Sequence, residues 1–177
     1  MIIWLTGMSC AGKTTIAKAL AERLRADAVE VEILDGDEVR NAFGNALGFQ
    51  RVDRDENIQR LGYMANLLSK HNIVVIVAAI SPYRAARDRV RATSPQFMEV
   101  FVNASLATCE SRDVKGLYKR ARSGEIANFT GVSDPYEPPL HPEIACWTEF
   151  ESIEESVEKI LSVFYHQLAR KQGNESL

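Results

Sequence analysis

The chain has 177 residues and a mass of 19.8 kDa, a length that usually forms one domain around one core. Its 21 Lys and Arg residues against 24 Asp and Glu residues give a net charge of −3, so no overall positive excess is available to bind a nucleic acid. With 46% hydrophobic and 25% charged residues, the composition is that of a globular domain and excludes a disordered or fibrous chain.

Local sequence features exclude two further classes. The longest apolar run, Ile73 to Ile80, has eight residues, whereas a helix that crosses a bilayer needs about 20. The N-terminus enters an apolar segment directly and lacks the features of a secretory signal, so we expect a cytoplasmic protein without a membrane partner. The three cysteines, Cys10, Cys109 and Cys146, have no zinc-binding spacing and are expected to stay reduced.

In the first half of the chain, short β-branched runs alternate with helical patterns, which predicts βαβ units and a mostly parallel sheet covered by helices on both faces. The expected strands are Ile2–Thr6, Val29–Leu34 and Ile73–Ala79, the last of which is the expected central strand. The expected helices are Lys13–Ala26, a short helix from near Asp37, and Arg54–His71.

The second half of the chain continues this alternation. The expected elements are a helix over Pro82–Thr93, a strand over Phe97–Val102, a helical stretch over Leu106–Arg122 that is weakest at Gly116, a strand over Glu143–Trp147 and a helix over Ser152–Arg170. Residues 123–142 are rich in Gly and Pro and predict an ordered loop, and a loop of that length is usually functional. The polar tail Gln172–Leu177 is expected to fray.

A phosphate-binding motif occupies residues 7–14, which read Gly7-Met8-Ser9-Cys10-Ala11-Gly12-Lys13-Thr14 and fit the pattern G-x-x-x-x-G-K-[ST]. The motif follows an expected strand and opens an expected helix, as a P-loop must. Backbone N–H groups and the helix N-terminus then face phosphate oxygens. We expect Lys13 to reach the β- and γ-phosphates and Thr14 to coordinate Mg²⁺.

Several classes of protein use a P-loop. The sequence has no Asn-Lys-x-Asp motif of a switch GTPase, and the strand Ile73–Ala79 ends in Ile80-Ser81-Pro82 rather than in the acidic residue of a motor ATPase. The acidic candidates, Asp35 and Asp37, follow the second expected strand instead. This placement favours a compact kinase that holds an acceptor hydroxyl near a carboxylate.

The acceptor side is less certain from the residues alone. Asp37 suits either an N-cap or a general base. Arg40 and Arg54 suit sulfate or phosphate oxygens, Phe49 can stack on a base, and Asn57 offers an amide. These residues also have ordinary structural interpretations. Phe49 can be a core aromatic, Arg40 and Arg54 can be solvated helix residues, and Asn57 can be a surface amide.

Ordered motifs over roughly residues 1–150 resemble the adenylylsulfate (APS) kinases. They are Leu34-Asp35-Gly36-Asp37, Gly48-Phe49, Arg54-Asp55-Glu56-Asn57, Ile80-Ser81-Pro82-Tyr83-Arg84, Cys109 to Tyr118, Phe129-Thr130-Gly131 and Asp134-Pro135-Tyr136-Glu137. The resemblance implies a three-layer P-loop α/β fold over residues 1–177, with a mobile lid at about 112–142. It also implies transfer of the γ-phosphate of MgATP to the 3′-hydroxyl of adenosine 5′-phosphosulfate, giving PAPS.

The same resemblance implies roles for individual residues. The implied ATP-binding residues are Gly7, Met8, Ser9, Cys10, Ala11, Gly12, Lys13, Thr14, Thr15 and Arg112. The implied acceptor-binding residues are Asp37, Arg40, Phe49, Arg54, Asn57, Ile80, Ser81, Lys115 and Phe129. The implied catalytic residues are Lys13, Asp37, Ser81 and Lys115, with Thr14 on the metal. Phe129 would close on the second face of the adenine, and Asp37 would chiefly orient the hydroxyl.

The sequence allows more than one interpretation at three points. The family counterpart of Ser81 has been regarded as phosphorylatable, but in-line transfer needs no enzyme phosphate, and we rank direct transfer first. The basic stretch Arg112 to Arg122 is either a lid or a solvated helix face. Glu38 and Cys10 depart from the family pattern and leave nucleotide affinity and thiol sensitivity open.

The resemblance further implies a homodimer and functional coupling to ATP sulfurylase. The alternatives are another P-loop small-molecule kinase and a catalytically silent nucleotide-binding module.

Overall fold

The computed structural model describes residues 1–43 and 47–174. Its five strands form one parallel sheet in the order β2-β3-β1-β4-β5. Their bounds are Ile2–Thr6 (β1), Val31–Asp35 (β2), Val74–Ala78 (β3), Phe97–Asn103 (β4) and Ile144–Trp147 (β5). The α/β class and the parallel sheet are therefore confirmed. The prediction that β3 is the central strand was wrong, because β1 lies in the middle of the sheet. Both strands are completely buried, so their apolar sequences do not distinguish the central strand from its neighbour.

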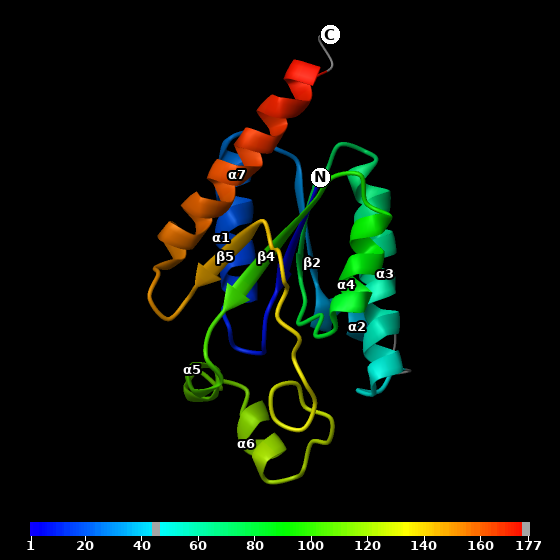
Figure 1. The fold of residues 1–177 in the computed structure, drawn as a ribbon, viewed down its shortest axis with the longest axis vertical. Helices are drawn as coiled ribbons and strands as arrows, with labels where there is room; N and C mark the ends of the chain where they lie inside the picture. Colours follow the sequence, from blue (N-terminus) through cyan, green and yellow to red (C-terminus); the bar gives the residue numbers. More distant parts are fainter. Residues whose placement is uncertain (44–46, 175–177) are drawn as a thin grey trace.

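Helices cover both faces of the sheet (Figure 1). Their bounds are Lys13–Ala26 (α1), Gly36–Ala42 (α2), Arg51–Ser69 (α3), Arg84–Ala92 (α4), Leu106–Ser111 (α5), Leu117–Arg122 (α6) and Ile153–Asn174 (α7). Helices α1 and α7 pack together on one face and α3 and α4 on the other. Alternate residues of β1 feed the two cores, Ile3 and Leu5 on the α1 side and Ile2 and Trp4 on the α3 side.

Some boundaries differ from the expected ones for local reasons. Helix α3 begins at Arg51, three residues early, because the Asp53 carboxylate accepts a hydrogen bond from the Gln50 N–H. The stretch 106–122 forms two helices, and α6 begins after Gly116, whose φ is 64°. Helix α7 extends to Asn174, so the first residues of the expected frayed tail are helical; the rest lies outside the described residues.

The carboxyl ends of the strands meet at one edge of the sheet, where α5, α6 and the 123–142 segment lie (Figure 1). At this edge β1 leads into the P-loop, β2 into Asp35 and β3 into Ile80. The fold thus brings the chemically important segments of the sequence together where open α/β sheets bind ligands. None of the helices in the described part of the chain has the length and hydropathy of a bilayer-spanning segment.

Candidate active site

The phosphate cradle is the loop between β1 and α1. Gly7 is required by space, because a Cβ there would lie 2.2 Å from the carbonyl oxygen of Val102. Gly12 is required by conformation, since its φ of 106° disfavours other residues. The Lys13 Nζ donates hydrogen bonds to the carbonyls of Gly7 at 2.9 Å and Met8 at 2.7 Å. Burial lowers the pKa of Lys13 to about 8, opposed chiefly by the charge of Asp37.

Asp35 links this cradle to helix α2. Its carboxylate accepts a hydrogen bond from Thr14 Oγ1 at 3.0 Å and caps α2 by accepting from the Asp37 N–H at 2.9 Å. The cap of α2 is therefore Asp35, and the N-cap interpretation of Asp37 was wrong. The Asp37 carboxylate is free to face the cavity, and it lies 3.4 Å from Lys115 Nζ.

A second recess lies between α2 and α3. Phe49 is 55% exposed, and guanidinium groups lie 5.0 Å (Arg40) and 5.8 Å (Arg54) from its ring centroid. Arg54 is buried and is fixed by the carbonyls of Phe49 and Asn128. Burial lowers the pKa of both arginines. The Asn57 amide donates to the Gly36 carbonyl at 3.3 Å, while its buried Oδ1 has no partner within the described part of the chain. The recess offers an aromatic face, two cations and a free acceptor.

The wall between these two regions is the loop after β3. Ser81 has a φ of 41°, in the left-handed region, and is only 2% exposed. Its hydroxyl accepts a hydrogen bond from the Trp4 indole at 3.0 Å and donates to the Ala79 carbonyl at 3.3 Å. The hydroxyl already has both a donor and an acceptor inside the protein.

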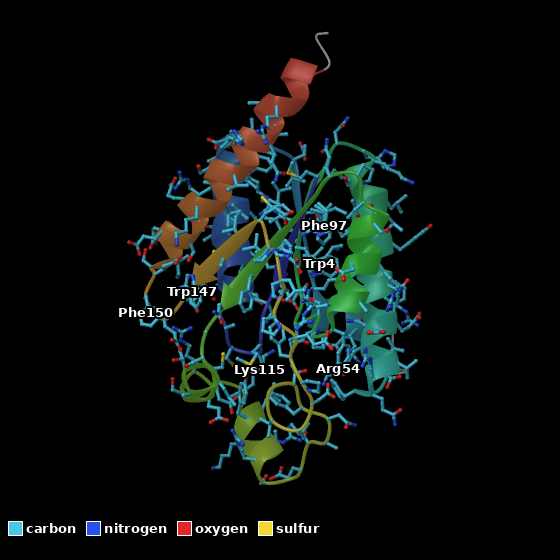
Figure 2. All side chains as sticks on the ribbon, viewed as in Figure 1. Trp4, Arg54, Phe97, Lys115, Trp147 and Phe150 are labelled. Atoms are coloured by element: carbon cyan, nitrogen blue, oxygen red, sulfur yellow. The ribbon has the colours of Figure 1, made fainter. Side chains whose placement is uncertain are left out.

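One cavity of about 810 Å³ joins the cradle and the recess. The predicted site residues that line it are Ser9, Cys10, Gly12, Lys13, Thr14, Thr15, Asp37, Arg40, Phe49, Arg54, Asn57, Ile80, Ser81, Arg112 and Lys115. Figure 2 shows Arg54 and Lys115, from separate elements, at the same end of the molecule. Four predicted residues are not in the lining, namely Gly7, Met8, Ala11 and Phe129. The Phe129 ring packs edge-to-face on Tyr118 at 4.9 Å, so its contact with an adenine stays a prediction.

Sequence reasoning missed Thr148, which follows β5 at the same edge of the sheet. Its hydroxyl donates to the Ala11 carbonyl at 2.8 Å and accepts from Arg112 at 3.1 Å, and its carbonyl accepts from Arg112 at 2.7 Å. Tyr118, which donates to the Ser9 carbonyl at 3.0 Å, was missed as well. The only available signal for Thr148 was its place at a strand end.

A magnesium ion would fit between the cradle and α2. Among the described residues there is no group of three or more His, Cys, Asp or Glu residues that could hold a metal ion unaided. Thr14 and Asp35 nevertheless present a hydroxyl and a carboxylate oxygen 3.0 Å apart at the P-loop. These are the hard oxygen ligands that Mg²⁺ takes when phosphates and water supply the rest of its shell.

The strand order and the cradle after β1 define the class as a P-loop nucleotide-binding protein. Gluconokinase from Sinorhizobium meliloti (18% identity, TM-score 0.59, 93% of this chain and 95% of that one) and shikimate kinase from Aquifex aeolicus (19%, 0.54, 96% and 99%) share the fold.

Within this class, the Adenylylsulphate kinase family matches residues 1–147, and the chain belongs to it. It is 60% identical to the adenylyl-sulfate kinase of Gloeothece citriformis over 90% of both chains, and 53% identical to that of Chloroflexus aurantiacus over 92% of this chain and 87% of the relative. It is 37% identical to a Mycobacterium tuberculosis APS kinase solved in complex with AMPPNP and APS (TM-score 0.88, 93% and 96% covered).

Proposed function

We propose that this protein is an adenylyl-sulfate kinase, which transfers the γ-phosphate of ATP to the 3′-hydroxyl of adenosine 5′-phosphosulfate. One observation carries the proposal: a single cavity holds a P-loop with Lys13, a recess in which two arginines lie beside the Phe49 ring, and the carboxylate of Asp37, which pairs with Lys115. A phosphate donor and a base-containing anionic acceptor can therefore meet at Asp37. The family membership supports the same reaction.

On the donor side, Lys13 and the backbone amides of residues 7–12 bind the β- and γ-phosphates. Thr14 and Asp35 would hold Mg²⁺, which would neutralise charge on the phosphates when bound. Arg112, fixed by Thr148 beside the cradle, contacts the nucleotide. The pair of Lys115 and Asp37 brings a cation to the path of the transferring group.

On the acceptor side, Phe49 stacks on the adenine, and Arg40, Arg54 and Asn57 hold the phosphosulfate and ribose. Asp37 orients the 3′-hydroxyl and accepts its proton as the phosphoryl group transfers. We propose direct transfer, because the Ser81 hydroxyl is buried and already hydrogen-bonded on both sides.

Further proposals concern the organisation of the protein. Residues 112–142 act as a lid of a single domain, and its closure brings Phe129 onto the adenine and excludes water. The enzyme acts in the cytoplasm as a homodimer and is supplied by an ATP sulfurylase. A similar protein, an APS kinase from Thiobacillus denitrificans, is hexameric; it is 34% identical to this chain, which covers 29% of that chain. Gel filtration with light scattering would distinguish a dimer from a larger assembly.

The function is tested by ADP release from purified protein with Mg²⁺ and ATP. APS, AMP, adenosine and shikimate are offered separately as acceptors. APS-dependent ADP release, with PAPS as product, is the expected result. Tight ATP binding without ADP release for any acceptor would favour a silent nucleotide-binding module, and release with shikimate or AMP alone would favour another small-molecule kinase.

A further inference from the structure

Arg87, in helix α4, is a completely buried cation that does not line the cavity. It is 2% exposed, and each of its three guanidinium nitrogens donates one hydrogen bond. The acceptors are Glu99 Oε1 in β4 at 2.7 Å, the Ser81 carbonyl at 2.6 Å and the Glu137 carbonyl at 2.8 Å. Two of the three therefore lie in segments outside the sheet.

The first of these segments is the wall of the cavity. Ser81 holds a left-handed φ of 41°, which a residue with a side chain adopts only when its surroundings fix it. Arg87 binds its carbonyl and the Trp4 indole binds its hydroxyl. Neither Arg87 nor Trp4 lines the cavity, so both hold the wall without entering it. The Thr6 hydroxyl in β1 adds hydrogen bonds to the Ile80 carbonyl at 2.9 Å and the Ser81 carbonyl at 3.5 Å. In Figure 2, Trp4 lies beside Phe97 within the sheet, and their rings are 5.8 Å apart.

The second segment, residues 134–137, lies within the Gly/Pro-rich loop 123–142. It is tied to the cavity wall at further points: the Glu137 N–H donates to the Pro82 carbonyl at 2.8 Å, the Glu137 carboxylate accepts from the Arg84 N–H at 2.8 Å, and Asp134 accepts from the Tyr83 hydroxyl at 2.5 Å. Arg87 adds to these contacts, because it donates one hydrogen bond to the Ser81 carbonyl in the wall and one to the Glu137 carbonyl in the segment.

Neutralising Glu99 alone does not explain this arrangement. The buried Glu99 carboxylate also has Arg91 within 3.3 Å, and Arg91 pairs in turn with Glu143 at 2.6 Å. Arg91 lies one helical turn from Arg87 and contacts the same carboxylate, but among the described residues it makes no hydrogen bond or ion pair with residues 80–82 or 134–137. Arg91 therefore serves as a control for the effect of the charge beside Glu99.

We infer that Arg87 is a positioning residue of the acceptor site: it fixes the Ser81 backbone and joins the segment 134–137 to the cavity wall. Loss of its planar, three-way geometry loosens the wall on the acceptor side, while the P-loop on the other side of the cavity keeps its shape. The expected change in the KM for APS rests on the proposed function.

The test compares Arg87→Lys with the matched control Arg91→Lys. Lysine keeps the charge beside Glu99 but has one nitrogen for three acceptors. In steady-state ADP release, Arg87→Lys is expected to raise the KM for APS by about tenfold or more and to leave the KM for ATP within about threefold. Arg91→Lys is expected to change neither. Equal changes in both KM values, or equal effects of the two variants, would overturn the inference.

A ligand-free measurement separates this inference from the proposed function. In hydrogen exchange, Arg87→Lys should speed exchange of the Arg84 and Glu137 amides, while Arg91→Lys should not. If the wild-type protein shows no turnover with APS, the proposed function fails and the exchange result still decides the positioning role. If Arg87→Lys does not fold, Tyr83→Phe removes one link, to Asp134, and keeps the Arg87 contacts. Faster exchange of the Glu137 amide in this variant, together with an unchanged KM for APS, would then refute the coupling of wall and segment.

Discussion

The substitution Asp37→Asn separates a catalytic carboxylate from a structural one. Asp37 and its partner Lys115 are 73% and 69% exposed, with 3.4 Å between the charged atoms. Such an exposed pair contributes about 0–1 kcal/mol after screening by solvent, so the free energy of unfolding should change by no more than about 1 kcal/mol. If Asp37 orients and deprotonates the acceptor hydroxyl, kcat should fall by about 10²–10⁴. ATP binding should be nearly unchanged when it is measured well below pH 8, because the lost charge of Asp37 lowers the pKa of Lys13 further.

The matched variant is Asp35→Ala, two residues away. It removes the α2 cap and the partner of Thr14, at 2.9 and 3.0 Å, which should cost about 1–2 kcal/mol and lower Tm by about 2–8 °C. Thermal unfolding, nucleotide titration and single-turnover ADP release measure the three quantities. The reasoning is refuted if Asp37→Asn keeps turnover within a few-fold, or if it destabilises the fold as much as Asp35→Ala does.

Three further predictions concern the P-loop and the cavity wall. Because burial holds the folded-state pKa of Lys13 at about 8, below the usual 10.5, ATP affinity should fall as pH rises above about 8, and Lys13→Met should abolish that pH dependence in a titration. The same lowered pKa makes this group's contribution to the unfolding free energy rise between about pH 8 and 10.5, because the unfolded chain binds the extra proton there. Thr148→Val should raise the KM for ATP about 5–10-fold, since the Ala11 carbonyl and one Arg112 nitrogen lose the hydroxyl that they share, while the second Arg112 nitrogen keeps the Thr148 carbonyl. Thr148→Ser should restore the KM, and an equal rise in the KM for APS would contradict this. Ser81→Ala leaves the Trp4 N–H buried and unpaired and should cost about 1–3 kcal/mol in urea unfolding; turnover within about tenfold of wild type is expected, and complete loss in the folded variant would contradict direct transfer.

The fold could be predicted because its signals are local. The strands β1 and β3 are short apolar runs, the other strands are rich in apolar residues, and the long helices bury residues at three- to four-residue spacing, so the parallel α/β class followed from the sequence. The order of the strands could not be read in this way. Both β1 and β3 are buried on both faces, and burial on two faces is all that an apolar run reports. The start of α3 at Arg51, three residues before the stretch that looked helical, depended on one side chain, Asp53, which accepts from the Gln50 N–H.

The site residues also differ in whether their signals are local in the sequence. The P-loop was predictable because the residues of that motif act within eight consecutive positions of the chain. Thr148 and Asp35 were not assigned because their roles depend on Arg112, Ala11 and Thr14, each at least 21 residues away in sequence. The role of Arg87 likewise depends on Ser81 and Glu137, which meet only in the folded chain.

The exposure of the Lys115–Asp37 pair also bears on the proposed lid. With both side chains largely in solvent, water would compete with the acceptor hydroxyl for the γ-phosphate. Closure of residues 112–142 over the pair would remove that competing water. It would also strengthen the electrostatic attraction between Lys115 and the transferring phosphate, because screening falls as water leaves. The C-terminal end of that segment is held at Glu137 by Arg87, which also holds Ser81. The proposed lid is therefore anchored on the acceptor side, so that acceptor binding and closure would be coupled through the cavity wall.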